Sequence, residues 1–252
     1  MTKTWTKRED YEPDITIVTV LFDGRMTSVP HTVGVYDASW VDKLYRGFAR
    51  NYSGTFDFIC LTDMNYKFAE PIRNIRLSVS VDQYGWMCLV DQYRPGLCKG
   101  QRFTVGLDTI ITGSVDEILN YKTKIGLCTD PTYPQLVCNA VTSATPEFCE
   151  EMWKMFEWKK TEWLNECQLS LVEVYEDKTS KVIKVPSEMD VLRRYYNDSD
   201  RLDVIFPYQI QSYKKHIVPD RRLLDTASIV YFHGVPKPHQ IMDQRWVQEN
   251  WI

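Results

Sequence analysis

Short apolar strand patterns alternate with helix patterns through the first two thirds of the chain, which sharply limits the possible folds. Residues 15–22 (Ile-Thr-Ile-Val-Thr-Val-Leu-Phe) are dense in β-branched side chains, as expected of a buried strand. Residues 39–52 carry an apolar stripe at helical spacing, with Ser39 as the candidate cap of the helix, and residues 56–61 form a second apolar strand pattern. This order predicts an α/β domain whose central sheet is mainly parallel and covered by helices on both faces.

The alternation continues downstream. Further strands are predicted at residues 72–79, 101–113, 125–128 and 136–141. Helices are predicted at residues 87–93, from Ser114 with a capping-box spacing to Glu117, and at 145–166, where Thr145 is the expected cap and Pro146 the first helical residue. The last third is less regular, and residues 197–203 are the best candidate for an exposed loop. We therefore predict a polar N-terminal segment, residues 1–14, followed by a single domain, residues 15–252.

Composition excludes several classes of protein. The 252 residues hold 30 Lys and Arg against 34 Asp and Glu, a net charge of −4, which argues against a protein dedicated to coating nucleic acid. No apolar stretch is long enough for a membrane span, and the N-terminus shows no secretory signal. The seven cysteines include no Cys-x-x-Cys pair, so we interpret them as reduced thiols. Together these features predict a cytoplasmic location.

Large aromatic side chains gather in two regions. Residues 152–163 contain Trp153, Phe156, Trp158 and Trp163, and the C-terminal end contains Trp246 and Trp251. Packing in the core is the main interpretation, because large aromatic side chains are usually buried. For residues 152–163 the alternative is stacking on a sugar or a base, and for Trp246 and Trp251 it is covering the site or forming a dimer contact.

Three acidic residues follow predicted strands. Asp23, Asp63 and Asp108 each come directly after or within an apolar strand pattern. In an open α/β sheet, ligands bind beyond the carboxyl ends of the strands, so these carboxylates are candidate site residues. Each one alone could also be an ordinary turn residue, because Asp commonly initiates turns.

A second candidate segment follows an apolar strand pattern near the C-terminus. Residues 229–239 read Ile-Val-Tyr-Phe-His-Gly-Val-Pro-Lys-Pro-His. His233 could supply a nitrogen ligand, Gly234 permits a close backbone approach, and Lys237 is a point charge suited to phosphate oxygens. The flanking prolines stiffen the loop that holds Lys237. The alternative is a surface turn.

Several strings, in order along the chain, resemble a known family. His233-Gly234-x-x-Lys237-Pro238 resembles the His-x-Gly-x-x-Lys-Pro-Trp motif of glycosyltransferase family 8, with His239 where Trp is usual. Residues 103–114 resemble the stretch that carries the family's Asp-x-Asp metal motif. Further blocks similar to bacterial and phage members lie at residues 41–47, 58–63, 85–97 and 212–214.

The resemblance implies a GT-A (Rossmann-like) fold and a role for each matched position. It implies that a nucleotide sugar, with UDP as the expected nucleotide, is bound by Leu21, Phe22, Asp63, Gly106, Leu107, His233, Gly234 and Lys237. Asp108 and His233 would ligate a divalent metal, Mn²⁺ or Mg²⁺. Lys237 and Asp108 would be the catalytic residues, so both segments must face one pyrophosphate.

The sequence also departs from the family pattern. Gly106 replaces the first Asp of Asp-x-Asp, Leu89 stands where a Lys is usual, and Glu166-Cys167-Gln168 stands where Gly-Asp-Gln is usual. Three alternatives remain open: a metal bound weakly through Asp108, His233 and the diphosphate; catalysis without metal, using Lys237; or binding without transfer.

The expected function is therefore transfer of a hexose from a nucleotide sugar to a hydroxyl acceptor, with retention of configuration. One alternative is a nucleotide-sugar-binding protein without transfer activity. Another is a phage-type transferase that glycosylates hydroxylated bases in DNA, suggested by the basic residues Lys214, Lys215, Arg221 and Arg222 in an aromatic-rich third of the chain. The acceptor, the sugar and the oligomeric state are left open.

Overall fold

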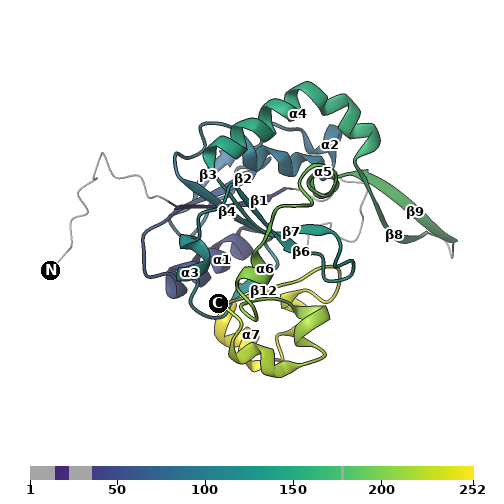
Figure 1. Ribbon diagram of the computed structural model, residues 1–252. Helices are drawn as coiled ribbons and strands as arrows, with labels where there is room; N and C mark the ends of the chain where they lie inside the picture. Colours follow the sequence, from purple (N-terminus) through teal and green to yellow (C-terminus); the bar gives the residue numbers. More distant parts are fainter. Residues whose placement is uncertain (1–14, 23–35, 177–178) are drawn as a thin grey trace.

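The computed structural model describes residues 15–22, 36–176 and 179–252 (Figure 1). Asp23, one of the three candidate carboxylates, lies outside these residues. No helix in the described ranges has both the length and the apolar character that a membrane crossing requires.

A seven-stranded sheet forms the centre of the domain. Its strands lie in the order β10-β6-β7-β4-β1-β2-β3. Their bounds are β1 (Ile15–Leu21), β2 (Asp57–Thr62), β3 (Arg73–Arg76), β4 (Gln101–Val105), β6 (Ile125–Thr129), β7 (Val137–Ala144) and β10 (Asp200–Arg201). Pairings of β7 with β4 and β6 are antiparallel, and the other four are parallel. This confirms the prediction of a mainly parallel sheet.

Alternating side chains of β1 enter two separate cores. Ile15, Ile17 and Leu21 pack against helix α1 (Ala38–Asn51). Val18 faces the opposite core, which includes residues of the 3-10 helix η3 (Met87–Tyr93) and of helices α4 (Pro146–Glu166) and α5 (Glu188–Tyr195). Because side chains alternate across a strand, one buried strand serves both layers. Helices cover both faces of the sheet, as predicted (Figure 1).

A second, three-stranded sheet joins the C-terminal third to the central domain. It consists of β11 (Ile210–Ser212), β12 (Ile229–Tyr231) and β5 (Thr109–Ile111), in the order β11-β12-β5. β12 runs antiparallel to β5, with Tyr231 opposite Thr109. This pairing aligns the segment after β12 with the turn before β5.

The remaining elements are a β-hairpin and several short helices. They are α2 (Val81–Tyr84), α3 (Asp116–Asn120), the hairpin strands β8 (Gln168–Glu176) and β9 (Thr179–Pro186), α6 (Leu202–Ile205), the π-helix η4 (Tyr213–Ile217), the 3-10 helices η5 (Arg221–Asp225) and η6 (Pro238–Ile241), and α7 (Arg245–Asn250).

The C-terminal end packs against helix α1. Arg46 Nε donates to the Ile252 carbonyl oxygen at 2.7 Å, and Arg50 donates to the Asn250 carbonyl oxygen at 2.7 Å. The rings of Trp251 and Trp40 meet edge to face, with centroids 4.7 Å apart. Trp251 is therefore a packing residue, as the sequence predicts.

Two sequence expectations about helix starts are wrong. Asp37, rather than Ser39, caps α1, and its carboxylate accepts from both the backbone N–H (2.9 Å) and the hydroxyl (2.6 Å) of Ser39. A carboxylate can accept two hydrogen bonds at once, which favours Asp37 as the cap. The expected capping box at Ser114 is absent, since α3 begins after Val115 without a side-chain cap. Thr145 caps α4 as predicted, with Pro146 in the first turn.

The expected exposed loop at residues 197–203 is partly wrong. β10 and α6 begin within this range, and the side chain of Leu202 is fully buried. Leu202 is the one apolar residue in this polar range, so its composition does not indicate that β10 pairs with β6. In the aromatic-rich helix α4, Phe156 and Trp163 are buried as expected, whereas Trp158 is 80% exposed.

Ile17 offers a test of the central packing. Replacement by alanine (Ile17→Ala) should lower the free energy of unfolding by about 2–5 kcal/mol, because it leaves a cavity in the core between β1 and α1. The matched control Trp158→Ala, at an exposed aromatic residue, should change it by less than about 0.5 kcal/mol. Urea denaturation of both variants measures the difference, and equal losses would contradict this description of the core.

Candidate active site

The turn between β4 and β5 positions Asp108. A Cβ atom added at Gly106 would lie 2.9 Å from Oδ1 of Asp108, closer than such atoms approach in proteins. The carboxylate of Asp108 therefore occupies space that a side chain at position 106 would otherwise fill. Glycine at this position allows the close approach.

Lys237 forms an ion pair with Asp108 across this turn. The Lys237 ammonium contacts Oδ2 of Asp108, and each of these side chains is only 15% exposed. The hydroxyl of Tyr36 lies 3.3 Å from the same oxygen and donates to it. Burial and the charge of Asp108 raise the pKa of Tyr36, so its hydroxyl keeps its proton.

Backbone pairing explains why these distant segments meet. The N–H of Phe232 donates to the carbonyl oxygen of Asp108 at 3.1 Å, which extends the β5–β12 pairing by one step. Gly234 then adopts a positive φ of 64°, a conformation that favours glycine. The sequence interpretation required Asp108 and the loop from His233 to Lys237 to lie together, and they do.

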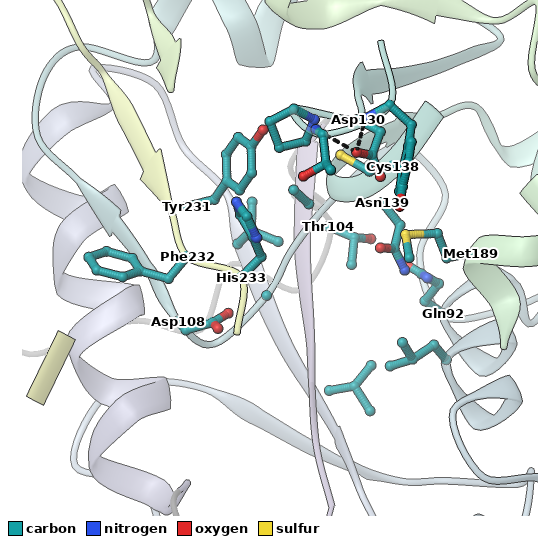
Figure 2. A pocket seen from close by; sticks show the side chains of 18 residues that line it. Gln92, Thr104, Asp108, Asp130, Cys138, Asn139, Met189, Tyr231, Phe232 and His233 are labelled. Carbon is teal, nitrogen blue, oxygen red and sulfur yellow. Dashed lines mark hydrogen bonds between the residues drawn. The ribbon is translucent and has the colours of Figure 1, made fainter. Parts of the chain in front are cut away.

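Two neighbouring cavities meet at Asp108. The lysine cavity has a volume of about 300 Å³ and is lined by Leu21, Phe22, Tyr36, Trp86, Leu107, Gly234 and Lys237 together with Val20, Leu89, Gly106 and Asp108. The last four residues also line a second cavity of about 400 Å³. We call the second one the amide cavity, because the side-chain amides of Gln92 and Asn139 line it (Figure 2).

Most of the predicted binding residues line one of these cavities. The exception among the described candidates is Asp63, at the end of β2, which lines neither. The cavities lie beyond the carboxyl ends of β1 and β4, where ligands bind in open α/β sheets. Leu89, where a Lys was expected, contributes apolar surface to both.

His233 lies on the wall of the amide cavity with its ring held by a serine. Nε2 of His233 is 2.9 Å from Oγ of Ser212, and that oxygen also accepts the backbone N–H of Lys215 at 3.2 Å. Burial lowers the pKa of His233, and the charge of Lys214 lowers it further. The imidazole is therefore neutral at physiological pH.

A buried carboxylate lies behind the opposite wall of the amide cavity. Glu188 is fully buried, and its Oε1 accepts from Tyr93 Oη (2.8 Å) and Gln92 Nε2 (3.1 Å), while Oε2 accepts from Asn139 Nδ2 (2.6 Å). Burial raises the pKa of Glu188 to about 7, although the hydrogen bonds from Tyr93 and Asn139 act in the opposite direction.

Sequence reasoning missed Glu188. The family pattern indicated Glu166-Cys167-Gln168 instead, where α4 ends, and none of these residues lines either cavity. The sequence Pro186-Ser187-Glu188 is typical of a helix start. In the structure, the Ser187 hydroxyl oxygen does cap α5, since it accepts the backbone N–H of Met189 at 3.2 Å. Nothing in that pattern distinguishes a buried carboxylate from an exposed one.

The expected metal ligands do not form a metal centre by themselves. Across residues 15–22, 36–176 and 179–252, no three His, Cys, Asp or Glu side chains gather as a metal site would require. Asp108 is already paired with Lys237, and Nε2 of His233 with Ser212. A divalent ion would have to take most of its oxygen ligands from the diphosphate and water. The metal at Asp108 and His233 stays a prediction, and no step of the proposed transfer reaction depends on it.

Comparison with solved structures identifies the architecture. The galactosyltransferase LgtC, solved with donor and acceptor sugar analogues, aligns with a TM-score of 0.53 and 10% identity over 94% of this chain and 96% of LgtC. The chain has the GT-A fold. The glycosyltransferase GlyE of Streptococcus pneumoniae TIGR4 (TM-score 0.54, 9% identity) covers 88% of this chain and 56% of GlyE.

A third neighbour shares this GT-A fold. The bifunctional glycosyltransferase WbbM aligns with a TM-score of 0.57 and 10% identity, over 95% of this chain and 51% of WbbM. This chain thus spans about half the length of GlyE and WbbM and nearly all of LgtC. No family model and no curated protein matches the sequence.

The buried carboxylate predicts a pH-dependent difference in stability. The pKa of Glu188 is raised in the folded chain from 4.5 to about 7, so its favourable contribution is complete below about pH 4.5 and is lost as pH rises through 7. Relative to Glu188→Gln, the native chain should lose roughly 3 kcal/mol of unfolding free energy over this range.

The control is Glu157→Gln, at an exposed glutamate of α4. Denaturation of the three proteins between pH 4.5 and 8 measures the difference. Parallel curves for the native chain and Glu188→Gln would show that Glu188 does not titrate as described.

Proposed function

We propose that this protein is a glycosyltransferase that uses a nucleotide sugar as its donor. The observation that carries the proposal is the Asp108–Lys237 pair, in which Asp108 lines both cavities and Lys237 lines the lysine cavity. The GT-A fold supports glycosyl transfer in general. The donor, a UDP-linked hexose, and a hydroxyl acceptor are the finer parts of the proposal.

The chemistry of each cavity suggests which part of the donor it binds. The lysine cavity combines a cation with the aromatic rings of Phe22, Tyr36 and Trp86, which suits a nucleoside diphosphate. No Lys or Arg is among the described residues lining the amide cavity, which offers amide, hydroxyl and imidazole groups together with the carboxylates of Asp108 and Asp130. Such polar groups suit the hydroxyls of a sugar.

In this proposal, Lys237 stabilises the leaving group. Cleavage of the bond between the anomeric carbon and the diphosphate leaves negative charge on the departing phosphate. A preorganised ammonium stabilises that charge more in the transition state than in the ground state. Asp108 holds Lys237 in place, and Tyr36 holds the carboxylate of Asp108.

We further propose transfer with retention, by attack on the face from which the diphosphate leaves. The acceptor oxygen forms a bond to the anomeric carbon, the bond to the diphosphate breaks, and a diphosphate oxygen takes the acceptor proton. NMR of the product would overturn this route if the anomeric configuration were inverted.

Lys237→Ala tests the assignment of the leaving-group residue. Turnover should fall roughly 10²- to 10³-fold, as when one preorganised donor is removed from a charge-stabilising site. Release of free UDP from the donor gives the rate. The control Lys154→Ala removes an exposed lysine of α4 and should leave the rate unchanged. Equal rates for Lys237→Ala and the native protein would contradict the assignment.

A screen of UDP-sugars, with and without Mn²⁺ and with a chelator, tests the function itself. We expect UDP release with at least one donor when a hydroxyl acceptor is present. Calorimetric binding of a UDP-sugar without any turnover would identify a binding protein instead. Label transfer to hydroxymethylated DNA, with retention on DNA that weakens with salt, would identify a DNA acceptor.

A further inference from the structure

The side chain of Gln92 ends in a buried carbonyl without a hydrogen-bond partner. Gln92 belongs to the 3-10 helix η3 and is 3% exposed. Its Nε2 donates to Glu188, and its backbone oxygen accepts from Arg102 at 2.7 Å. Its side-chain oxygen Oε1 has neither a protein donor nor contact with solvent.

The surroundings fix the orientation of this amide. Glu188 receives hydrogen bonds from Gln92, Tyr93 and Asn139, so donors converge on one carboxylate. When Glu188 is ionised, a reversed Gln92 amide would place its oxygen against an acceptor oxygen of Glu188 and break that contact. The NH₂ group of Gln92 therefore faces Glu188, and Oε1 is the atom left over.

An unpaired buried carbonyl is costly, and here a cavity lies next to it. Leaving such a group unsatisfied costs about 1–3 kcal/mol. Gln92 lines the amide cavity together with Asn139 and Met189, across from Asp108 and His233 (Figure 2). A ligand that donates a hydrogen bond to Oε1 would remove the cost. Because Oε1 is closed to solvent in the free protein, the side chains that cover it must move aside when such a ligand binds.

The neighbouring apolar side chains narrow the chemistry of that ligand. Leu89 precedes Gln92 by three residues on a 3-10 helix, a spacing that places both side chains on one face. Leu89, Met189 and Ala140 line the same cavity. A carbonyl acceptor beside apolar surface suits a sugar ring, which presents a hydroxyl next to C–H groups.

We infer that Gln92 is a specificity-determining residue whose Oε1 accepts a hydrogen bond from one hydroxyl of the transferred sugar. The inference rests on the proposed function, because it takes the amide cavity as the site of the donor sugar. It goes beyond that proposal by naming the residue that recognises the sugar and the atom that makes the contact.

The inference is tested by removing the sugar hydroxyl, the Gln92 amide, and both together. Calorimetry would measure the dissociation constants of UDP, of the preferred UDP-sugar and of its monodeoxy analogues. In the native protein, loss of one particular hydroxyl should weaken binding about 10- to 100-fold. In Gln92→Met, which keeps the side-chain length without a polar group, the same loss should change binding less than about three-fold. The affinity for UDP alone should stay the same.

Two controls separate recognition from a purely structural role. Gln83→Met makes the same replacement at an exposed glutamine of α2 and should keep the native discrimination. Thermal unfolding will show whether Gln92→Met folds. If it does not, Gln92→Asn replaces it, because its shorter side chain withdraws the carbonyl from the ligand. Gln92→Asn should also lose the discrimination between the analogues.

The inference fails if no monodeoxy analogue couples to Gln92, so that native and variant proteins rank the analogues alike. It also fails if the variants weaken UDP as much as the UDP-sugar. In either case the native protein would still bind the UDP-sugar. The absence of any UDP or UDP-sugar binding to the native protein would instead overturn the proposed function, and the inference with it.

Discussion

The ion pair between Asp108 and Lys237 joins two parts of the chain that are 129 residues apart. It depends on the β5–β12 pairing, which sets the turn after β4 beside the segment after β12. Neither charge would be stable alone at this depth, because a partly buried charge needs a partner. The pair thus keeps a cation and a carboxylate together at the edge of the sheet, and the two cavities meet at that edge.

The site divides its polar groups by type. The Lys237 ammonium lies in the lysine cavity, whereas the described lining of the amide cavity holds amide, hydroxyl, imidazole and carboxylate groups without a Lys or Arg, in front of the buried Glu188. Diphosphate and sugar differ in the same way, since one is anionic and the other is rich in hydroxyls. Under the proposed function, the two parts of one donor would lie in adjoining cavities, because the β4–β5 turn lines both.

Elements with strong periodicity were predictable from the sequence. The β-branched run at residues 15–22, the apolar stripe of α1 and the Thr145-Pro146 start of α4 all predicted what the structure contains. The β8–β9 hairpin was not predicted, because charged residues such as Glu173, Lys181 and Lys184 interrupt its strand pattern. For the site, motif order brought Asp108, His233 and Lys237 together. Gln92 and Glu188 escaped notice, because their importance arises from burial, which sequence spacing does not reveal.

The β5–β12 pairing also bears on how the site arises during synthesis. Every parallel pairing of β1 with its neighbours is possible once β4 has emerged from the ribosome. Lys237 follows more than 120 residues later, so a nascent chain can hold the central strands long before Lys237 reaches Asp108. Under the proposed function, nucleotide binding would therefore begin only after the C-terminal third has been synthesised.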